Sequence, residues 1–116
     1  MKRFAVCFLL LVLFGGFLSA QELPKITIVN DTGYDVYCIF VSPNDDNYWG
    51  DDLLGEEEIL NNGDSVQVTL QFPLNEKDVY DMMLIDLDDD TYSKFGVQLT
   101  ENARIVFTSG DFDSYY

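Results

Sequence analysis

Hydrophobic and polar residues alternate along most of the chain after Pro24, with the period of two that a β-strand produces. Turn-forming residues interrupt this alternation at short intervals, and no long stretch has the period of an amphipathic helix. The pattern predicts seven short strands, over residues 26–29, 34–41, 57–60, 65–72, 79–87, 92–99 and 104–108. We therefore expect an all-β fold, a single antiparallel β-sandwich of about seven strands with an immunoglobulin-like or similar Greek-key arrangement.

The second predicted strand is hydrophobic on both faces, so we expect it at the centre of a sheet and covered on both sides. Within it, Val36, Cys38 and Phe40 would share one face, and Cys38 would be a buried, unreactive thiol. The alternating positions of all the strands together predict the core as Ile26, Ile28, Val36, Cys38, Phe40, Val66, Val68, Leu70, Met82, Leu84, Ile105 and Phe107.

Three segments carry strong turn signals: residues 30–33, 61–64 and 88–91. The second has an Asn-Gly pair and favours a hairpin between the strands on either side of it. The first also contains a glycosylation sequon, Asn30-Asp31-Thr32, but a turn accounts for these residues without any further assumption.

The first twenty residues have the layout of a secretory signal peptide. Two basic residues precede a hydrophobic run, and small residues follow it before the polar Gln21. A retained membrane anchor is the alternative, but a spanning helix needs about 20 continuous apolar residues and a glycine pair interrupts this run. We expect cleavage after Ala20, a periplasmic or extracellular protein without membrane insertion, and one domain over residues 21–116 whose tail, 109–116, frays.

The chain is strongly acidic. Loss of Lys2 and Arg3 with the leader lowers the basic count from 6 to 4 against 21 acidic residues, so the net charge falls from −15 to −17. Such a surface repels nucleic acid and anionic membranes, and it favours a cationic partner, a protein or a metal ion. The alternative is that the charge only keeps the protein soluble. The partner's identity and the oligomeric state stay open.

An enzymatic function is not expected. The chain contains no histidine, which excludes Ser-His and Cys-His nucleophile pairs and metal sites built on imidazole. It also contains no glycine-rich phosphate loop. A small hydrolase using a pair of carboxylates is a distant third possibility, and a deep pocket holding two close carboxylates would favour it.

The candidate metal site is the alternating set Asp86, Asp88 and Asp90, because calcium prefers several carboxylate oxygens converging from one loop. Asp45 and Asp46, with Asp51 and Asp52, would supply further ligands if their loop lies at the same end of the sandwich. An EF-hand is excluded, because its glycine and its final glutamate are missing. The alternative is a solvated acidic turn whose carboxylates accept hydrogen bonds from the turn backbone.

This stretch resembles a calcium loop of the phospholipid-binding β-sandwich domains found in protein kinase C. The order of Asp86, Asp88, Phe95 and Gly96 is similar to the order in those domains. Lys94 stands near the place of their later loop aspartate, which is a departure from that pattern.

The candidate interaction residues are Tyr48 and Trp49, in the irregular segment after the second strand. As the only tryptophan, Trp49 is either an exposed recognition anchor or a cap that covers Leu53 and Leu54, with its ring nitrogen bonded to a loop carbonyl.

A set of short motifs along the chain resembles a family of small exported bacterial proteins with a conventional leader and one all-β domain. The motifs are Asn30-x-Thr32-Gly33, Ser42-Pro43, Trp49-Gly50-x-Asp52-x-Leu54, Gly63-Asp64-Ser65, Tyr80-Asp81 and Asp86-x-Asp88. The resemblance implies export, a bacterial source and an all-β fold, and no activity. We therefore expect an exported, non-enzymatic binding module, with a calcium-binding sandwich as the alternative.

Overall fold

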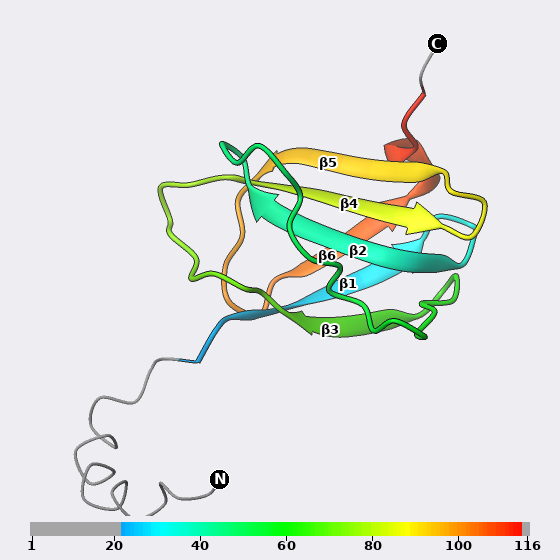
Figure 1. Cartoon of the computed structure of the whole chain (residues 1–116), viewed down its shortest axis with the longest axis horizontal. Coiled ribbons are helices and arrows are strands. Elements are labelled where there is room, and N and C mark those ends of the chain that lie inside the picture. Colours follow the sequence, from blue (N-terminus) through cyan, green and yellow to red (C-terminus); the bar gives the residue numbers. More distant parts are fainter. Residues whose placement is uncertain (1–21, 115–116) are drawn as a thin grey trace, which may run out of the picture.

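Six β-strands form two three-stranded sheets whose inner faces enclose the core (Figure 1). The computed structural model describes residues 22–114. Within this range the strands are β1 (Lys25–Asp31), β2 (Val36–Pro43), β3 (Ser65–Thr69), β4 (Tyr80–Asp86), β5 (Thr91–Val97) and β6 (Arg104–Thr108), followed by a short 3₁₀ helix, η1 (Ser109–Asp111). The chain is therefore all-β, with one strand fewer than the sequence predicts.

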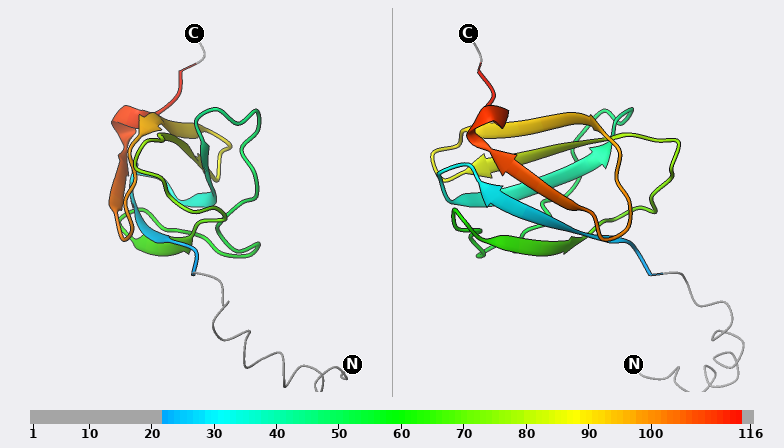
Figure 2. Two further views of the ribbon diagram at one scale, coloured as in Figure 1. Left: turned by 90° about the vertical axis from the view of Figure 1, so that its left-hand side faces the viewer. Right: turned by 180° about the vertical axis from the view of Figure 1, so that it is seen from behind.

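The sheets are mostly antiparallel. One has the strand order β3-β1-β6, in which β1 pairs antiparallel with β3 and parallel with β6. The other has the order β2-β4-β5, and both of its pairs are antiparallel. Figure 2 shows the two sheets from one end and from behind. The central strands are β1 and β4. The second predicted strand, residues 34–41, corresponds to β2, which lies at an edge of its sheet, so the prediction that it is central is wrong.

The predicted strand over residues 57–60 is not formed, and part of this segment instead covers the edge of β2. Leu60 makes an isolated bridge with Val36, whose N–H donates to the Leu60 carbonyl over 3.0 Å. Farther along β2, the Oδ1 atom of Asp52 accepts the N–H of Ile39 over 2.9 Å. The irregular segment thereby occupies backbone groups of an edge strand that would otherwise be open to another chain.

The turn at residues 61–64 is present, but it does not make the predicted hairpin. Asp64 donates its N–H to the Asn61 carbonyl over 3.0 Å, and Gly63 adopts a φ of +93°, which glycine tolerates without strain. The strand that follows, β3, pairs with β1 rather than with residues 57–60.

A β-bulge in β2 changes which of its residues face the core. The register with β4 shifts between Val36 and Cys38. As a result Val36, Ile39 and Val41 are buried, whereas Cys38 and Phe40 are half-buried on the opposite side of the sheet. The prediction that Cys38 and Phe40 belong to the core is therefore wrong, because strict alternation does not hold through a bulge.

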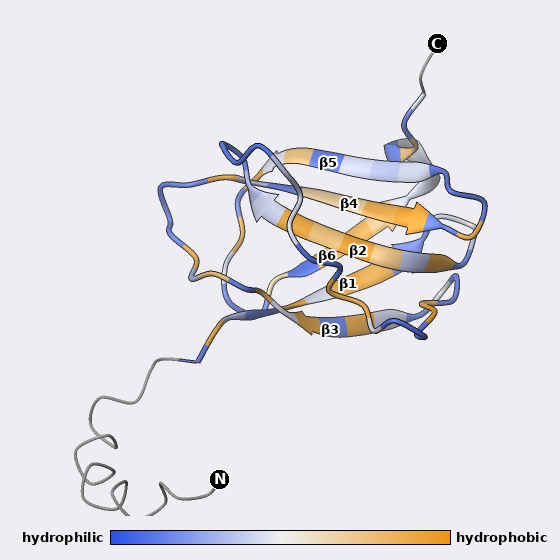
Figure 3. Cartoon of the chain, viewed as in Figure 1, coloured by the Kyte–Doolittle hydropathy of each residue, from blue (hydrophilic) through white to orange (hydrophobic). Residues whose placement is uncertain are grey.

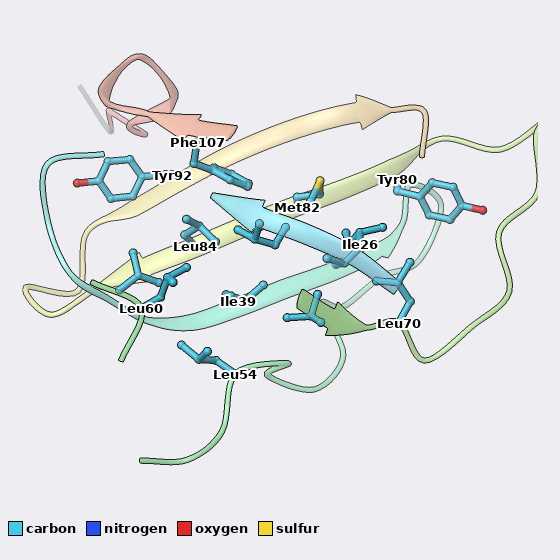
Figure 4. Close-up of a cluster of buried hydrophobic side chains, with 14 of the residues drawn as sticks. Ile26, Ile39, Leu54, Leu60, Leu70, Tyr80, Met82, Leu84, Tyr92 and Phe107 are labelled. Atoms are coloured by element: carbon cyan, nitrogen blue, oxygen red, sulfur yellow. The ribbon is translucent and has the colours of Figure 1, made fainter. Parts of the chain in front are cut away.

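The core is apolar and draws on both sheets, as Figure 4 shows. The predicted core residues that are buried are Ile26, Ile28, Val36, Val68, Leu70, Met82, Leu84 and Phe107. Val66 and Ile105 are only partly buried against this cluster. Tyr80 and Tyr92, which the pattern did not select, are almost completely enclosed.

Part of the predicted tail contacts the sandwich, since residues 109–111 form η1 and Phe112 bridges to β5, whereas residues 115–116 lie outside the described residues. That the tail frays stays a prediction. Thr108 and Asp111 form a reciprocal capping box around η1. Phe112 then makes an antiparallel bridge with Tyr92 of β5, and their rings meet edge to face with centroids 5.7 Å apart. The last turn of the chain thus covers part of the β5 edge.

Candidate functional site: an acidic pole

Several turns meet at one end of the sandwich, where β4 ends in Figure 1, and hydrogen bonds join them. The Gly33 N–H donates to Asn62 Oδ1 over 2.8 Å, and the Asn62 N–H donates to Asp35 Oδ1 over 2.9 Å. The Leu87 N–H donates to the Asp35 carbonyl over 3.0 Å. The β1–β2 turn, residues 60–64 and the β4–β5 turn therefore hold one another in place.

Carboxylates and aromatic rings line two hollows at this end. A hollow of about 350 Å³ lies between Tyr34, Asp88, Asp90 and Phe112. A second, of about 320 Å³, is lined by Tyr34, Asp35 and Asp88, so the two hollows share a wall. We call this end the acidic pole and define it by these five residues. Figure 3 shows that the connection from β4 to β5 is mostly hydrophilic.

The predicted metal ligands are close together but differ in exposure. Asp86, Asp88 and Asp90 each offer one carboxylate oxygen, and these three atoms lie within 4.8 Å of one another. Asp88 and Asp90 are exposed, whereas Asp86 is only 1 % exposed. The sequence therefore located the cluster but not the division of roles within it.

Asp86 organises the turn from inside. Its Oδ1 accepts the N–H groups of Asp88 and Asp90 over 2.8 and 2.9 Å, and its Oδ2 accepts the Tyr92 hydroxyl over 2.9 Å. These three hydrogen bonds satisfy most of the accepting capacity of a buried carboxylate. A cation at this site would have to share Asp86 with the turn backbone, while Asp88 and Asp90 face solvent.

Asn30 fixes the β1–β2 turn, which carries Tyr34 and Asp35 of the pole, through its side-chain hydrogen bonds. Its Nδ2 donates to the carbonyls of Tyr34 and Leu60 over 2.8 and 2.9 Å. Its Oδ1 accepts the N–H and the hydroxyl of Thr32 over 3.1 and 2.7 Å. Because Asn30 is completely buried and both amide atoms are bonded, its side chain is structural and is not accessible to glycosylation. That a turn accounts for this sequon stays a prediction.

Two tyrosines near the pole donate their hydroxyl groups to carboxylates and have raised pKa values. The Tyr37 hydroxyl donates to Asp89 Oδ1 over 2.6 Å, and this hydrogen bond is the main cause that raises the pKa of Tyr37 to about 12. Burial, and then the hydrogen bond to the Asp86 carboxylate, raise the pKa of Tyr92 above its ordinary value. Both tyrosines therefore stay neutral at physiological pH beside carboxylates.

The first two carboxylates of the other acidic loop, Asp45 and Asp46, lie away from the pole. Asp45 and Asp46 follow the end of β2 that pairs with Tyr80, the first residue of β4, whereas Asp86 is the last residue of β4. The condition under which they would add ligands to Asp86, Asp88 and Asp90 is therefore not met.

Trp49 lies on the outer face of the β2-β4-β5 sheet. The Trp49 ring is half-buried between Phe40 and Phe95, with centroid distances of 6.5 and 6.4 Å. Tyr48 is 74 % exposed.

The sequence analysis did not single out Tyr34, Tyr92 or Phe112 as residues of the pole. A weak signal was present in the first and the last, since each is an aromatic residue within an acidic turn or tail. Their convergence depends on the pairing of β4 with β5 and on the path of η1, which alternation alone does not reveal.

Comparison with known proteins found no matching family model, no matching curated protein and no matching solved structure. The resemblances to small exported bacterial proteins and to the calcium loops of protein kinase C therefore stay predictions. The predicted leader, residues 1–20, lies outside the described residues. Within residues 22–114, no helix is long and apolar enough to cross a membrane.

Proposed function

We propose that this protein is an exported, non-enzymatic binding module that takes a cationic partner at the acidic pole. The observation that carries this proposal is the pair of adjoining hollows that share Tyr34 and Asp88. A lysine or arginine side chain entering there meets both carboxylates and aromatic rings, which are the two groups that attract an organic cation most strongly. The joined turns support the proposal, because a prearranged site loses less entropy on binding.

The distribution of charge supports the same class of partner. Of the four basic residues described, Lys94 is paired with Asp111 over 3.2 Å, and Lys25 and Arg104 lie on strands of the β3-β1-β6 sheet. Lys77 shares a hollow with Asp45 and Asp78. None of the four lines the hollows of the pole, so an approaching cation meets an uncompensated negative surface.

Export rests on the first twenty residues alone. The test is N-terminal sequencing of the protein recovered from the periplasm and from the culture fluid, with Gln21 expected as the first residue. Recovery of an intact Met1 in the membrane fraction would contradict this part of the proposal.

The absence of histidine from the chain supports a non-enzymatic role. Asp88 and Asp90 are the carboxylates nearest to the arrangement of a hydrolase, and both are exposed. A general acid at neutral pH needs a desolvated carboxyl group, which an exposed side chain does not provide. An immunoglobulin-like or related Greek-key relationship stays a prediction, and the binding proposal does not depend on it.

Calcium binding is the second candidate, and the short separation of the three aspartate oxygens favours it. Calcium takes six to eight oxygen ligands, so these three carboxylates would need water or further groups to complete the shell. Asp86 is also bonded three times within the protein. We therefore place an organic cation ahead of calcium at this end.

The proposal is tested by titrating hexalysine into the isotopically labelled protein at 150 mM salt and following its amide resonances. We expect shifts confined to the pole. The double substitution Asp88→Asn and Asp90→Asn should weaken binding about tenfold, which corresponds to about 1.4 kcal/mol. The matched control, Glu76→Gln with Glu101→Gln, removes the same charge beside a hollow away from the pole and should change the affinity less than twofold.

Equal losses in the two double variants would mean general charge attraction and would refute the site. Thermal unfolding with calcium chloride addresses the second candidate. A rise in Tm with calcium that magnesium does not reproduce, and that the Asp88 and Asp90 substitutions abolish, would assign the pole to calcium instead.

A further inference from the structure

The outer face of the β2-β4-β5 sheet is apolar, although an antiparallel sheet with one face on the core normally presents polar residues to solvent. The outward-facing positions include Cys38 and Phe40 of β2, Met83 and Ile85 of β4, and Phe95 of β5. Phe95 is 65 % exposed. The other four residues are half-buried, and apolar side chains on the solvent-facing side of a sheet in a very acidic protein indicate an interaction surface.

Two local features place these residues outward. The bulge in β2 turns Cys38 and Phe40 away from the core, as described above. A second register shift, in the pairing of β4 with β5, accompanies Gly96, which has a φ of +66° and donates its N–H to Asp81 Oδ1 over 3.0 Å. Phe95 precedes this glycine and faces solvent.

Trp49 connects the two edge strands across this face. The segment that follows β2 folds back over the sheet (Figures 1 and 2). The Trp49 ring then lies between Phe40 and Phe95, tilted by 50° and 45° to them. We call these three rings the aromatic row. Tyr48, beside Trp49 in the chain, is largely exposed.

The loop that brings Trp49 into the aromatic row is acidic. The loop that carries Trp49 also carries Asp45, Asp46, Asp51 and Asp52, all of them exposed. Lys77, which shares a hollow with Asp45, is the one basic residue described near this loop. A second copy of the chain would bring the same carboxylates together, so like charges oppose self-association through this face.

We infer that the aromatic row is a docking surface for an arginine-rich segment of a partner protein. A guanidinium group stacks on aromatic faces and pairs with carboxylates, and this face offers both within one loop and two strands. A flat carbohydrate surface is disfavoured, because stacking on it requires coplanar rings and these rings are tilted by 45° and 50°. The site is separate from the acidic pole.

The chemistry of Cys38 is compatible with this use. Burial, together with the negative charge of Asp52, raises the pKa of the Cys38 thiol to about 11. The thiol therefore stays protonated at neutral pH and behaves as part of the apolar surface.

The single tryptophan makes the docking surface directly observable. The experiment titrates a ten-residue peptide of alternating arginine and serine into the purified protein at 150 mM salt and follows the fluorescence of Trp49. The matched probe replaces each arginine with citrulline, which has the same shape without the charge. We expect a saturable change with the arginine peptide and at least tenfold weaker binding of the citrulline peptide.

Phe95 and Val106 provide the protein controls, because both are exposed and they lie in different sheets. Phe95→Ala should weaken binding of the arginine peptide about tenfold, whereas Val106→Ala, on β6, should change it less than twofold. Both side chains are exposed, so the fold should survive both changes, and melting curves check this. Asp88→Asn with Asp90→Asn should also have little effect here, which separates failure of this inference from failure of the proposed function.

Equal affinity for the arginine and citrulline peptides, or no loss on Phe95→Ala, would overturn the inference. A response of Trp49 to a neutral oligosaccharide such as cellohexaose, without one to the arginine peptide, would also overturn it and would assign the face to carbohydrate.

Discussion

Two buried polar side chains, Asn30 and Asp86, organise turns at the acidic pole, and they do so with different chemistry. Each lies at or near the end of a strand, and the Oδ1 of each accepts the N–H of the residue two positions later, Thr32 or Asp88. Each is almost completely buried. Asn30 also donates two hydrogen bonds to backbone carbonyls, whereas Asp86 only accepts.

The difference follows from the groups that surround each side chain. The carbonyls of Tyr34 and Leu60 face Asn30, so an amide is needed to donate to them. Two N–H groups and a hydroxyl face Asp86, so an acceptor with several lone pairs is needed there. The amide leaves its turn neutral, whereas the carboxylate adds a structural negative charge beneath the exposed Asp88 and Asp90.

We expect the largest loss of stability when a carboxylate replaces the amide of Asn30. Asn30→Asp removes both donors and places carboxylate oxygens against two carbonyls in a fully buried site. We expect a loss of about 4 kcal/mol in the free energy of unfolding, because a buried charge is left without a partner. Urea unfolding followed by circular dichroism measures it. A loss under about 1 kcal/mol would show that the site rearranges or admits water.

Replacing the Asp86 carboxylate with an amide should destabilise the protein less than Asn30→Asp does. Truncating Asp86 to alanine should destabilise it more than the amide does. Asp86→Ala leaves two N–H groups and the Tyr92 hydroxyl without their acceptor, and we expect a loss of about 3 kcal/mol. Asp86→Asn retains one oxygen for both N–H groups, and its amide can donate to the Tyr92 hydroxyl, so we expect a loss of about 1 kcal/mol. Urea unfolding of the two variants at pH 7 tests this order. Equal losses would mean that the negative charge, not hydrogen bonding, is what the turn needs.

Tyr92 sharpens the comparison, because it gives the Asp86 turn a pH dependence that the Asn30 turn lacks. The folded state raises the pKa of Tyr92 above the ordinary value, so the neutral hydroxyl is the form that stabilises the fold. Its contribution is complete below about pH 10, the ordinary tyrosine pKa, and is lost as the pH rises through the higher folded value. Tyr92→Phe should lose about 1.5 kcal/mol at pH 7.

The corresponding measurement is Tm from pH 8 to pH 11 for the wild type and for Tyr92→Phe. We expect the wild type to lose stability more steeply above pH 10. Tyr37, whose pKa is raised to about 12, is present in both proteins, so the difference between the curves isolates Tyr92. Parallel curves would show that the Tyr92 hydroxyl does not titrate differently in the folded and unfolded states.

Much of the fold could be predicted from alternation, and the errors have specific physical causes. β1, β4 and β6 follow the period of two closely, so their core positions Ile26, Leu84 and Phe107 were predicted correctly. Alternation fails in β2, because a bulge changes its phase between Val36 and Cys38.

The predicted strand over residues 57–60 contains only one residue in a bridge, because it borders β2 without entering a continuous ladder. Alternation measures which residues suit a strand, and it does not report which strands have partners.

The candidate site was predictable only in part. The acidic turn after β4 is evident from composition, and its position between two paired strands was expected. The burial of Asp86 was not, because it depends on the Tyr92 hydroxyl reaching it across the hairpin. The roles of Tyr34 and Phe112 depend on contacts between distant segments, which a single sequence does not display.

The smallest effect on stability is expected at the exposed carboxylates, and it has the opposite sign. Asp88→Asn and Asp90→Asn each remove one of several like charges close to Asp86, while the backbone N–H groups of both positions still donate to it. We expect unfolding free energies unchanged or raised by up to about 0.5 kcal/mol at low salt, with the gain shrinking at 1 M salt as the repulsion is screened. Paired urea unfolding curves at the two salt concentrations measure this change.

The control for these two substitutions is Asp86→Asn, which removes the same charge but should destabilise the protein at both salt concentrations. Destabilisation by more than about 1 kcal/mol at position 88 or 90 would show that the exposed carboxylates hold the turn together. In that case they would not be available to a partner. A gain in stability on substitution at positions 88 and 90, together with a loss on substitution of Asp86, would separate two roles. The Asp86 carboxylate would stabilise the turn, whereas Asp88 and Asp90 would be available to a partner.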